Sequence, residues 1–420
     1  MGIFKKIKEL SLLILPFYSK RRSFVKKSIN IICKPHLIIN DFIKILKFKE
    51  EKAFYKNKKT MLFIDKSLPE YDKDAGSRSV FNYLSYFCKI NIKVKFIYDD
   101  FINNERYAND LRNIGIEVLD NPYFKYFWKK YLKKNKDYFD YVFLSRPFVA
   151  DKYIDYIKKI TKAKIFYLGH DLHYLRENRI YNLTKEKYLL QVSKIYKKIE
   201  LSIVKKADIS YFVSAEEIKI LKEFDSSINC KIIPINIFPK KEIIQFDKNR
   251  KDLLFVGGFK HSPNTDAVLW FEERIFNKIK MDIQDIKLYI IGSNPPKEIK
   301  KLESSYIKIL GHVNDDILDE YYKKCRICIA PLRCGAGVKG KIIEAMYRQI
   351  PVITTTIGAE GLKNIENCLV IEDEPEKFAE KLICMYNDYY FLSKLSMNGF
   401  NYINEYFTEN NMNELIKEDF

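Results

Sequence analysis

The chain has 420 residues, of which 47% are hydrophobic and 15% aromatic, with only 14 glycines and 13 prolines. This length exceeds one ordinary core and predicts two domains, and the apolar content excludes an intrinsically disordered chain. The net charge of +19 is uneven: residues 1–59 hold sixteen Lys and Arg against four acids, a balance of +12, so the remaining body carries only about +7. Such a body argues against a nucleic-acid-binding protein, whose binding surface would be basic.

The leader, residues 1–59, combines this charge with apolar residues. Between Ile3 and Leu15 apolar residues alternate with lysines, and a basic cluster follows at 20–22. The apolar run at 10–17 is far shorter than the roughly 20 residues of a membrane span, and no small-residue cleavage site of a signal peptide follows it. The pattern predicts a basic amphipathic helix on a membrane surface, with a helical extension packed on the body as the alternative.

Short apolar strands alternate with helices in two series along the rest of the chain. The first series has expected strands at 60–65, 93–98, 117–119, 141–145, 164–168 and 209–214, and the second at 252–256, 287–291, 307–310, 326–330, 352–354 and 368–371. Fully apolar strands between helices are typical of parallel sheets covered on both faces. We therefore expect an α/β protein with two facing, Rossmann-like, doubly wound domains that bind ligands in the cleft at the carboxyl ends of the strands.

The domain bounds follow from these series. A segment with two prolines and mixed charge at 234–249 is the expected linker. We expect the first domain over 60–238, the second over 239–385, and helices over 386–420 that cross back to the first domain.

Eight cysteines are scattered without a disulfide framework. Cys325 and Cys328 have the spacing of a redox or zinc pair, but they fall inside an expected strand with no second pair beside them. We interpret them as buried free thiols of a reducing cytoplasm.

The most informative stretch is the segment from Arg333 to Gly361. An apolar strand ends at Ala330, a glycine-rich basic loop follows, and a helix begins near Lys341. This order brings free backbone N–H groups and the positive end of a helix dipole to one place, where a phosphate or diphosphate binds. It predicts a nucleotide site.

These residues resemble a known family. The stretches at 255–270, 310–313 and 333–361 resemble the nucleotide-sugar domain of retaining GT-B glycosyltransferases of the "glycosyl transferases group 1" family, family four. The loops at 72–78 and 167–179 resemble the acceptor-side loops of the same proteins. The resemblance spans roughly residues 60 to 385 and leaves the leader outside.

The resemblance implies a donor site that neutralises two phosphates with N–H groups and cations and without a metal. Glu344 matches the glutamate that accepts hydrogen bonds from the ribose hydroxyls, and a surface pair with Arg348 is its alternative. The expected donor-binding residues are Gly258, Lys260, Arg333, Gly335, Gly337, Val338, Lys339, Lys341 and Glu344. One position departs from the family: a second glutamate, which helps to hold the donor sugar in many members, is Ala336 here, so backbone amides at Gly337 and Val338 are expected to take over that contact.

The first domain supplies the expected catalytic and acceptor-side residues. His170 corresponds to the histidine near the reacting sugar, and Asp171 is expected to act as the acceptor base or to cap the next segment. Gly76 is the expected close-approach glycine after the first strand. Arg176 and Arg179 would suit an anionic acceptor such as a lipid-linked diphosphate, or a solvated face.

Three other functions fit parts of the pattern. Gly335-x-Gly337-x-x-Gly340 is also a dinucleotide fingerprint, with Glu360 near the position of a ribose-binding acid, but an NAD-dependent oxidoreductase more often carries it after its first strand. A non-catalytic nucleotide-sugar binding module or a sugar-nucleotide epimerase would share the fold.

The sequence thus predicts a retaining glycosyltransferase, without cofactor or metal, that is cytoplasmic or peripheral at the inner face of the cytoplasmic membrane. Its expected partners are a nucleotide-diphosphate sugar donor, a glycan or lipid-linked glycan acceptor and an anionic membrane surface at residues 1–59, with no nucleic acid. Bacterial surface polysaccharide synthesis is the process that the family resemblance implies.

Overall fold

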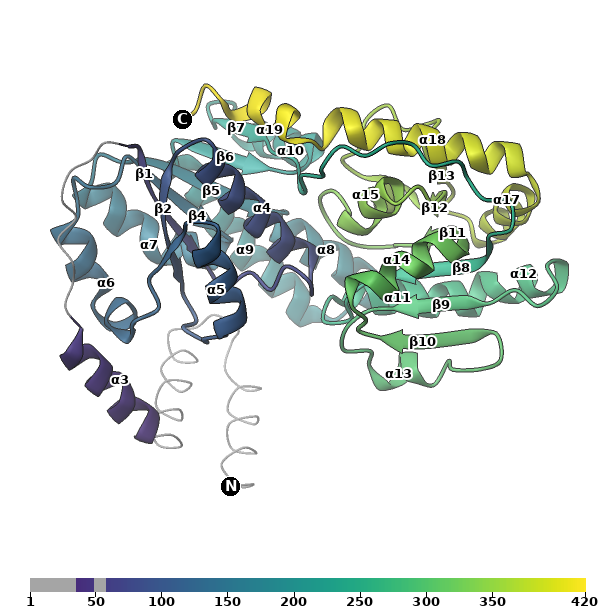
Figure 1. Ribbon diagram of the computed structural model, residues 1–420, viewed down its shortest axis with the longest axis horizontal. Coiled ribbons are helices and arrows are strands. Elements are labelled where there is room, and N and C mark those ends of the chain that lie inside the picture. Colours follow the sequence, from purple (N-terminus) through teal and green to yellow (C-terminus); the bar gives the residue numbers. More distant parts are fainter. Residues whose placement is uncertain (1–34, 49–57) are drawn as a thin grey trace.

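The computed structural model describes residues 35–48 and 58–420, which form two sheets side by side (Figure 1). The helix expected between Ile3 and Leu15 lies outside the described residues. Every strand pairing in both sheets is parallel. This confirms the predicted fold class of two parallel α/β domains.

The first sheet has seven strands in the order β3-β2-β1-β4-β5-β6-β7. The strands are β1 (Thr60–Asp65), β2 (Lys93–Tyr98), β3 (Glu117–Val118), β4 (Tyr141–Ser145), β5 (Lys164–His170), β6 (Ile209–Phe212) and β7 (Cys230–Ile232). The helices of this half are α3 (Pro35–Lys47), α4 (Ala75–Lys89), α5 (Glu105–Asn113), α6 (Pro122–Lys134), α7 (Pro147–Ile160), α8 (His173–Thr184), α9 (Lys187–Lys206) and α10 (Ala215–Phe224).

Side chains that alternate along β1 explain why both faces of this sheet are apolar. Phe63 belongs to a core cluster with Val80 and Leu84 of α4. Its neighbour Ile64 belongs to the opposite cluster, which includes Tyr153 of α7. Because helices cover both faces of the sheet, every position of β1 is buried, which accounts for the continuous apolar run that the sequence predicted.

The second sheet has six strands in the order β10-β9-β8-β11-β12-β13. The strands are β8 (Lys251–Val256), β9 (Leu288–Ile291), β10 (Ile307–Gly311), β11 (Cys325–Ala330), β12 (Val352–Thr354) and β13 (Val370–Ile371). The helices are α11 (Ser262–Phe271), the π-helix η1 (Glu272–Phe276), α12 (Asn277–Asp282), α13 (Lys297–Lys300), α14 (Asp315–Lys324), α15 (Gly340–Tyr347), α16 (Thr356–Ala359), α17 (Pro375–Asn387), α18 (Tyr389–Tyr406) and α19 (Glu409–Ile416).

The C-terminal helices return to the first sheet. In Figure 1, α18 runs along the second domain and α19 lies over the first, beside β7. The Phe420 ring stacks on Phe166 of β5 at 4.7 Å between centroids. The Asp419 side chain accepts hydrogen bonds from the Tyr211 hydroxyl at 2.5 Å and the Lys231 ammonium at 2.7 Å. These contacts tie the chain end to the core of the first domain.

Asp419→Ala should therefore destabilise the first domain. The substitution removes a carboxylate that is 6% exposed and takes this partner from the Tyr211 hydroxyl and the Lys231 ammonium, whereas Lys164 keeps its hydrogen bond of 2.9 Å to the Asp419 carbonyl. Because both lysines are about a third exposed, we expect a loss of roughly 2 kcal/mol, less than for a fully buried pair. Thermal denaturation should show a fall of several degrees, whereas Glu418→Ala, a neighbouring exposed carboxylate, should leave the midpoint unchanged. Equal effects of the two substitutions would contradict this account of the C-terminal segment.

Candidate active site

A cavity of about 980 Å³ lies between the two domains. Residues that directly follow β1, β4 and β5 line one wall, and residues that follow β8, β9 and β11 line the other. The cavity thus lies at the carboxyl ends of the strands, where open α/β sheets bind ligands.

The glycine loop between β11 and α15 approaches the first domain closely. Gly335 and Gly337 have φ angles of +136° and +65°, conformations that residues with a side chain rarely adopt. A Cβ on Gly337 would also lie 3.2 Å from Val213 and 3.4 Å from the Cβ of Asp171, both in the first domain. Glycine is therefore needed here for backbone shape and for the approach of the two domains.

Helix α15 begins beside two half-buried lysines. Its N-cap residue, Lys339, makes no side-chain capping bond, so the start of the helix keeps the free N–H groups that bind phosphates. The Lys341 ammonium donates to Asn264 Oδ1 and lies 4.6 Å from the ring centroid of Phe255. Burial lowers the pKa of Lys341 to about 7 and also lowers the pKa of Lys339. A bound anion would favour the charged form of both lysines, which burial disfavours.

Arg179 crosses from α8 to the glycine loop. Its guanidinium pairs with both carboxylate oxygens of Glu360 at 2.7 Å and donates to the carbonyl of Gly335, also at 2.7 Å. Glu360 lies 3.5 Å from the Lys339 ammonium. The sequence predicted Arg179 on the acceptor side, but its contacts hold the donor-side loop.

Glu344 lies on α15 and lines the cavity. Its Oε1 accepts a hydrogen bond of 2.6 Å from Arg78 of α4, while Arg348 is 3.8 Å away. Burial raises the pKa of Glu344, and Arg78 opposes that rise. The expected alternative, a pair with Arg348, is thus the weaker contact, because Arg348 also pairs with Asp319.

The remaining donor-side residues divide into two groups. Gly258, Lys260 and Val338 line the cavity with Lys339, Lys341 and Glu344. Arg333 does not line it: its guanidinium pairs with Asp266 at 2.5 and 3.1 Å. Ala336, in place of the family's second glutamate, is part of the cavity wall.

His170 ends β5 at the opposite wall of the cavity, with a positive φ of 61°. Its Nε2 lies 2.9 Å from the hydroxyl of Ser145. Burial and the charge of Arg146 lower the pKa of His170 well below its usual range. The imidazole is therefore neutral and can exchange hydrogen bonds with a sugar hydroxyl.

Asp171 is held by its neighbours. Its carboxylate accepts from Arg176 at 2.5 Å and lies 3.1 Å from His173 Nδ1. Burial alone would raise the pKa of Asp171, but Arg176 and His173 lower it far more. A carboxylate this weakly basic is a poor proton acceptor, so the geometry favours a positioning role over general base catalysis.

Sequence reasoning missed Arg78, Arg146 and His261. Arg146, directly after β4, has a positive φ of 75° and pairs with the buried Asp65 at 2.9 Å. His261 precedes α11 and lines the cavity near Arg176, and burial lowers its pKa to about 4. Arg78 and His261 stood in the recognised stretches 72–78 and 255–270, but no local pattern indicated the distant partner of Arg78.

Two alternatives, a metal or redox site at Cys325 and Cys328 and a dinucleotide site at the glycine loop, find no additional support in the described residues. No cluster of His, Cys, Asp and Glu suited to a metal ion occurs within 35–48 and 58–420, and Cys325 and Cys328 lie buried on β11 with free thiols. The dinucleotide-like glycines follow β11, the fourth strand of the second sheet along the chain, and Glu360 is paired with Arg179.

Comparisons with known proteins agree with this architecture. Residues 250–388 match the family model described as "Glycosyl transferases group 1". A Klebsiella pneumoniae protein described as an uncharacterized 44.6 kDa protein in the cps region is 29% identical over 184 residues, which are 42% of this chain and 47% of the relative. The uncharacterized glycosyltransferase MJ1178 of Methanocaldococcus jannaschii is 26% identical over 183 residues, 43% of this chain and 51% of the relative. The chain thus matches about half the length of each relative.

Similarity to solved structures extends across both domains. The Anabaena protein Alr3699/HepE, solved in complex with UDP and glucose, aligns with a TM-score of 0.62 at 15% identity and covers 86% of this chain and 99% of its own. This likeness shows the fold, and the family match confirms the resemblance found in the sequence. The chain therefore has the GT-B fold, and residues 250–388, in its second domain, match the glycosyl transferases group 1 family.

Proposed function

We propose that the protein transfers a sugar, with retention of anomeric configuration, from a nucleotide-diphosphate donor to a hydroxyl of a glycan acceptor. The observation that carries this proposal is one cavity that brings Glu344 and Lys341 of the second domain opposite His170 of the first. The family of the second domain and the UDP and glucose bound to the fold neighbour from Anabaena support a nucleotide-sugar donor.

The donor would lie against the start of α15. Lys339, Lys341 and Lys260 supply positive charge for the two phosphates, and the N–H groups at Val338 and Gly340 supply hydrogen bonds. Glu344 accepts from the ribose hydroxyls. Gly258, Gly335 and Gly337 give the surrounding loops their shape, whereas Arg333, paired with Asp266, contributes at a distance.

Catalysis would need no protein nucleophile. The bond between the anomeric carbon and the phosphate oxygen breaks, the acceptor oxygen bonds to that carbon on the same face, and the leaving diphosphate takes the acceptor's proton. The lysines stabilise the charge that develops on the diphosphate. The neutral His170 orients a hydroxyl of the donor sugar, and Asp171 fixes the adjoining loop through Arg176.

The two arginines expected to bind an anionic acceptor, Arg176 and Arg179, would not be available to it. Arg176 and Arg179 already have carboxylate partners, Asp171 and Glu360. An anionic group of the acceptor would therefore bind away from these two arginines. A role in surface polysaccharide assembly is supported by the Klebsiella relative from a cps region.

A ligand panel followed by a turnover assay tests the proposal. Thermal shifts are measured with UDP, GDP, dTDP, ADP, CMP and NAD, and a ligand at 100 times its Kd should stabilise its domain by roughly 2.7 kcal/mol. The sugar donors of the nucleotide that binds are then assayed for release of nucleoside diphosphate with glycan acceptors. Stabilisation by NAD alone would support an oxidoreductase. Nucleotide binding without sugar transfer would favour a binding module. A chemical change of the donor sugar in the absence of an acceptor would favour an epimerase.

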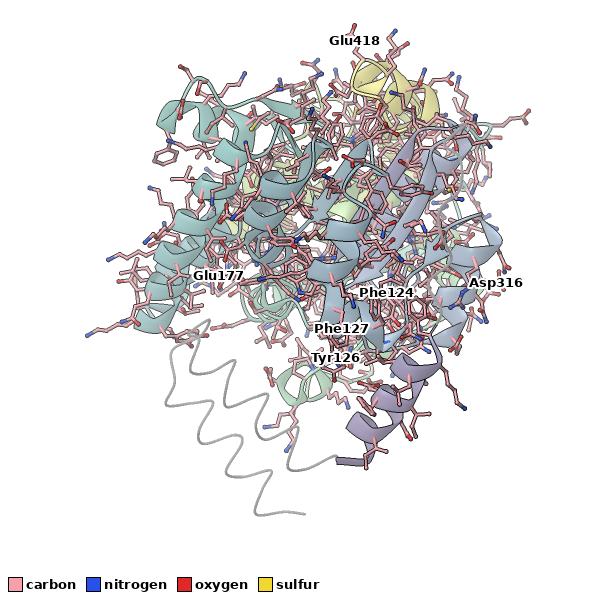
Figure 2. The ribbon with its side chains drawn as sticks, turned by 90° about the vertical axis from the view of Figure 1, so that its left-hand side faces the viewer. Phe124, Tyr126, Phe127, Glu177, Asp316 and Glu418 are labelled. Carbon is pink, nitrogen blue, oxygen red and sulfur yellow. The ribbon has the colours of Figure 1, made fainter. Side chains whose placement is uncertain are left out.

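We also propose that the protein binds anionic membrane surfaces through α3 and α6. Four apolar residues of α3 at helical spacing, Ile39, Phe42, Ile43 and Leu46, are between 44% and 70% exposed. Asp41, on another side of α3, contacts Tyr126 of α6. Tyr126 and its neighbour Phe127 are labelled in Figure 2. The two helices together hold seven lysines and one acid, which complements anionic lipid headgroups. No helix within the described residues is long and apolar enough to cross a bilayer.

Sedimentation with vesicles checks this surface. Wild type should bind vesicles rich in phosphatidylglycerol more tightly than phosphatidylcholine vesicles. The double substitution Phe42→Ser with Leu46→Ser should weaken that binding at least tenfold, because both side chains lose apolar burial. Ile102→Ser removes a similarly exposed residue, 71% exposed, outside the two helices and should change nothing. Unchanged binding by the double variant would exclude α3 as the contact surface.

A further inference from the structure

Arg78 belongs to the first domain but contacts the proposed ribose site of the second. It lies on α4, where its Nε donates to the carbonyl of Tyr71 at 3.0 Å. Its Nη1 reaches Glu344 Oε1 at 2.6 Å, across 266 residues of sequence, and its Nη2 lies 3.7 Å from Asp315. The Tyr71 carbonyl thus holds the guanidinium at the domain interface.

Arg78 takes only one of the two carboxylate oxygens. Among the described residues Glu344 Oε2 has no hydrogen-bond partner, and Glu344 lines the cavity. The other cation near this carboxylate, Arg348, is 3.8 Å away and pairs with Asp319. The orientation of Glu344 therefore depends mainly on a side chain from the opposite domain.

We propose that Arg78 is a positioning residue of the nucleotide site: it holds Oε1 so that Oε2 can accept from the ribose. This rests on the proposed function, in which Glu344 binds ribose. It follows that the donor site is complete only when the domains are closed, since the fixed carboxylate needs a residue from each. Donor affinity and closure of the cleft are then coupled through one ion pair.

A double-mutant cycle by calorimetry tests the inference. The probe is the nucleoside diphosphate, among UDP, GDP, dTDP and ADP, that stabilises wild type most. We expect Arg78→Met to weaken binding about tenfold or more, and to do little in the Glu344→Ala background. Arg78→Lys, which keeps one bond to Oε1, should restore part of the affinity, and Arg348→Met, the matched control, should cost less than about threefold.

The outcomes separate this inference from the proposed function. Equal losses of affinity for Arg78→Met in both Glu344 backgrounds would overturn the positioning role. Tighter binding by Arg78→Met would also overturn it, because Arg78 would then compete with ribose for Glu344. If Glu344→Ala alone leaves affinity unchanged, the ribose site itself is wrong. Should Arg78→Met fail to fold, Arg78→Lys in both Glu344 backgrounds gives the same test. With a turnover assay, the donor KM should rise more than kcat falls.

Discussion

Glu344→Ala should weaken nucleoside diphosphate binding about 100-fold. Hydrogen bonds to a charged group contribute roughly 1.5–3 kcal/mol each, and the loss of about 3 kcal/mol corresponds to this factor. The fold should remain intact, because the substitution also removes the cost of burying a carboxylate, and Arg78 keeps Asp315 nearby at 3.7 Å. Calorimetric titration of wild type and variant with UDP, or with whichever nucleotide of the panel binds, measures the difference.

The control for Glu344→Ala is an exposed glutamate of the same domain. Glu320→Ala changes α14 at the surface and should leave both the Kd and the melting temperature unchanged. An unchanged Kd for Glu344→Ala, with the variant folded, would remove the ribose assignment and with it the strongest support for a donor site on α15. A large fall in melting temperature would instead assign Glu344 a structural role as the partner of Arg78.

The parts of this site that the sequence could predict are those built from residues that are neighbours along the chain. The strand, glycine loop and helix from Ile327 to Tyr347 are contiguous, so their geometry follows from neighbouring residues. Lys341 and Glu344 line the cavity, as that local geometry predicts. Both sheets were predictable for the same reason, since each apolar strand is a local run. The short strand β7 was missed because three residues carry too little pattern.

Contacts between the domains could not be predicted. Arg78 meets Glu344 across 266 residues, and Arg179 meets Glu360 across 181. A single sequence gives the charges of these side chains but not their partners. Arg333 illustrates the same limit. A basic residue in a phosphate-binding loop suggested a phosphate contact, but its guanidinium pairs with Asp266 of α11.

Lys341→Met should remove diphosphate binding and stabilise the empty protein. The lysine is half-buried beside Phe255, and its pKa is lowered to about 7. Charging it in the empty site costs on the order of 4–5 kcal/mol relative to the unfolded chain, and methionine avoids that cost with similar volume. The variant should melt several degrees higher at neutral pH, yet bind UDP about 100-fold more weakly, while its weak affinity for uridine, which has no phosphate, stays the same.

The pH dependence of Lys341 distinguishes it from a passive core residue. Because the pKa is lower in the folded than in the unfolded protein, the folded state holds fewer protons between pH 7 and about 10, so wild type gains stability as pH rises through this range. The variant lacks that gain. Diphosphate binding restores the charge, so wild type should take up a proton on binding at pH 8, and its affinity should fall as pH rises above 7. Calorimetry in buffers of different ionisation enthalpy measures this uptake, and an equal uptake by Lys341→Met would move the titrating group to Lys339 or the ligand.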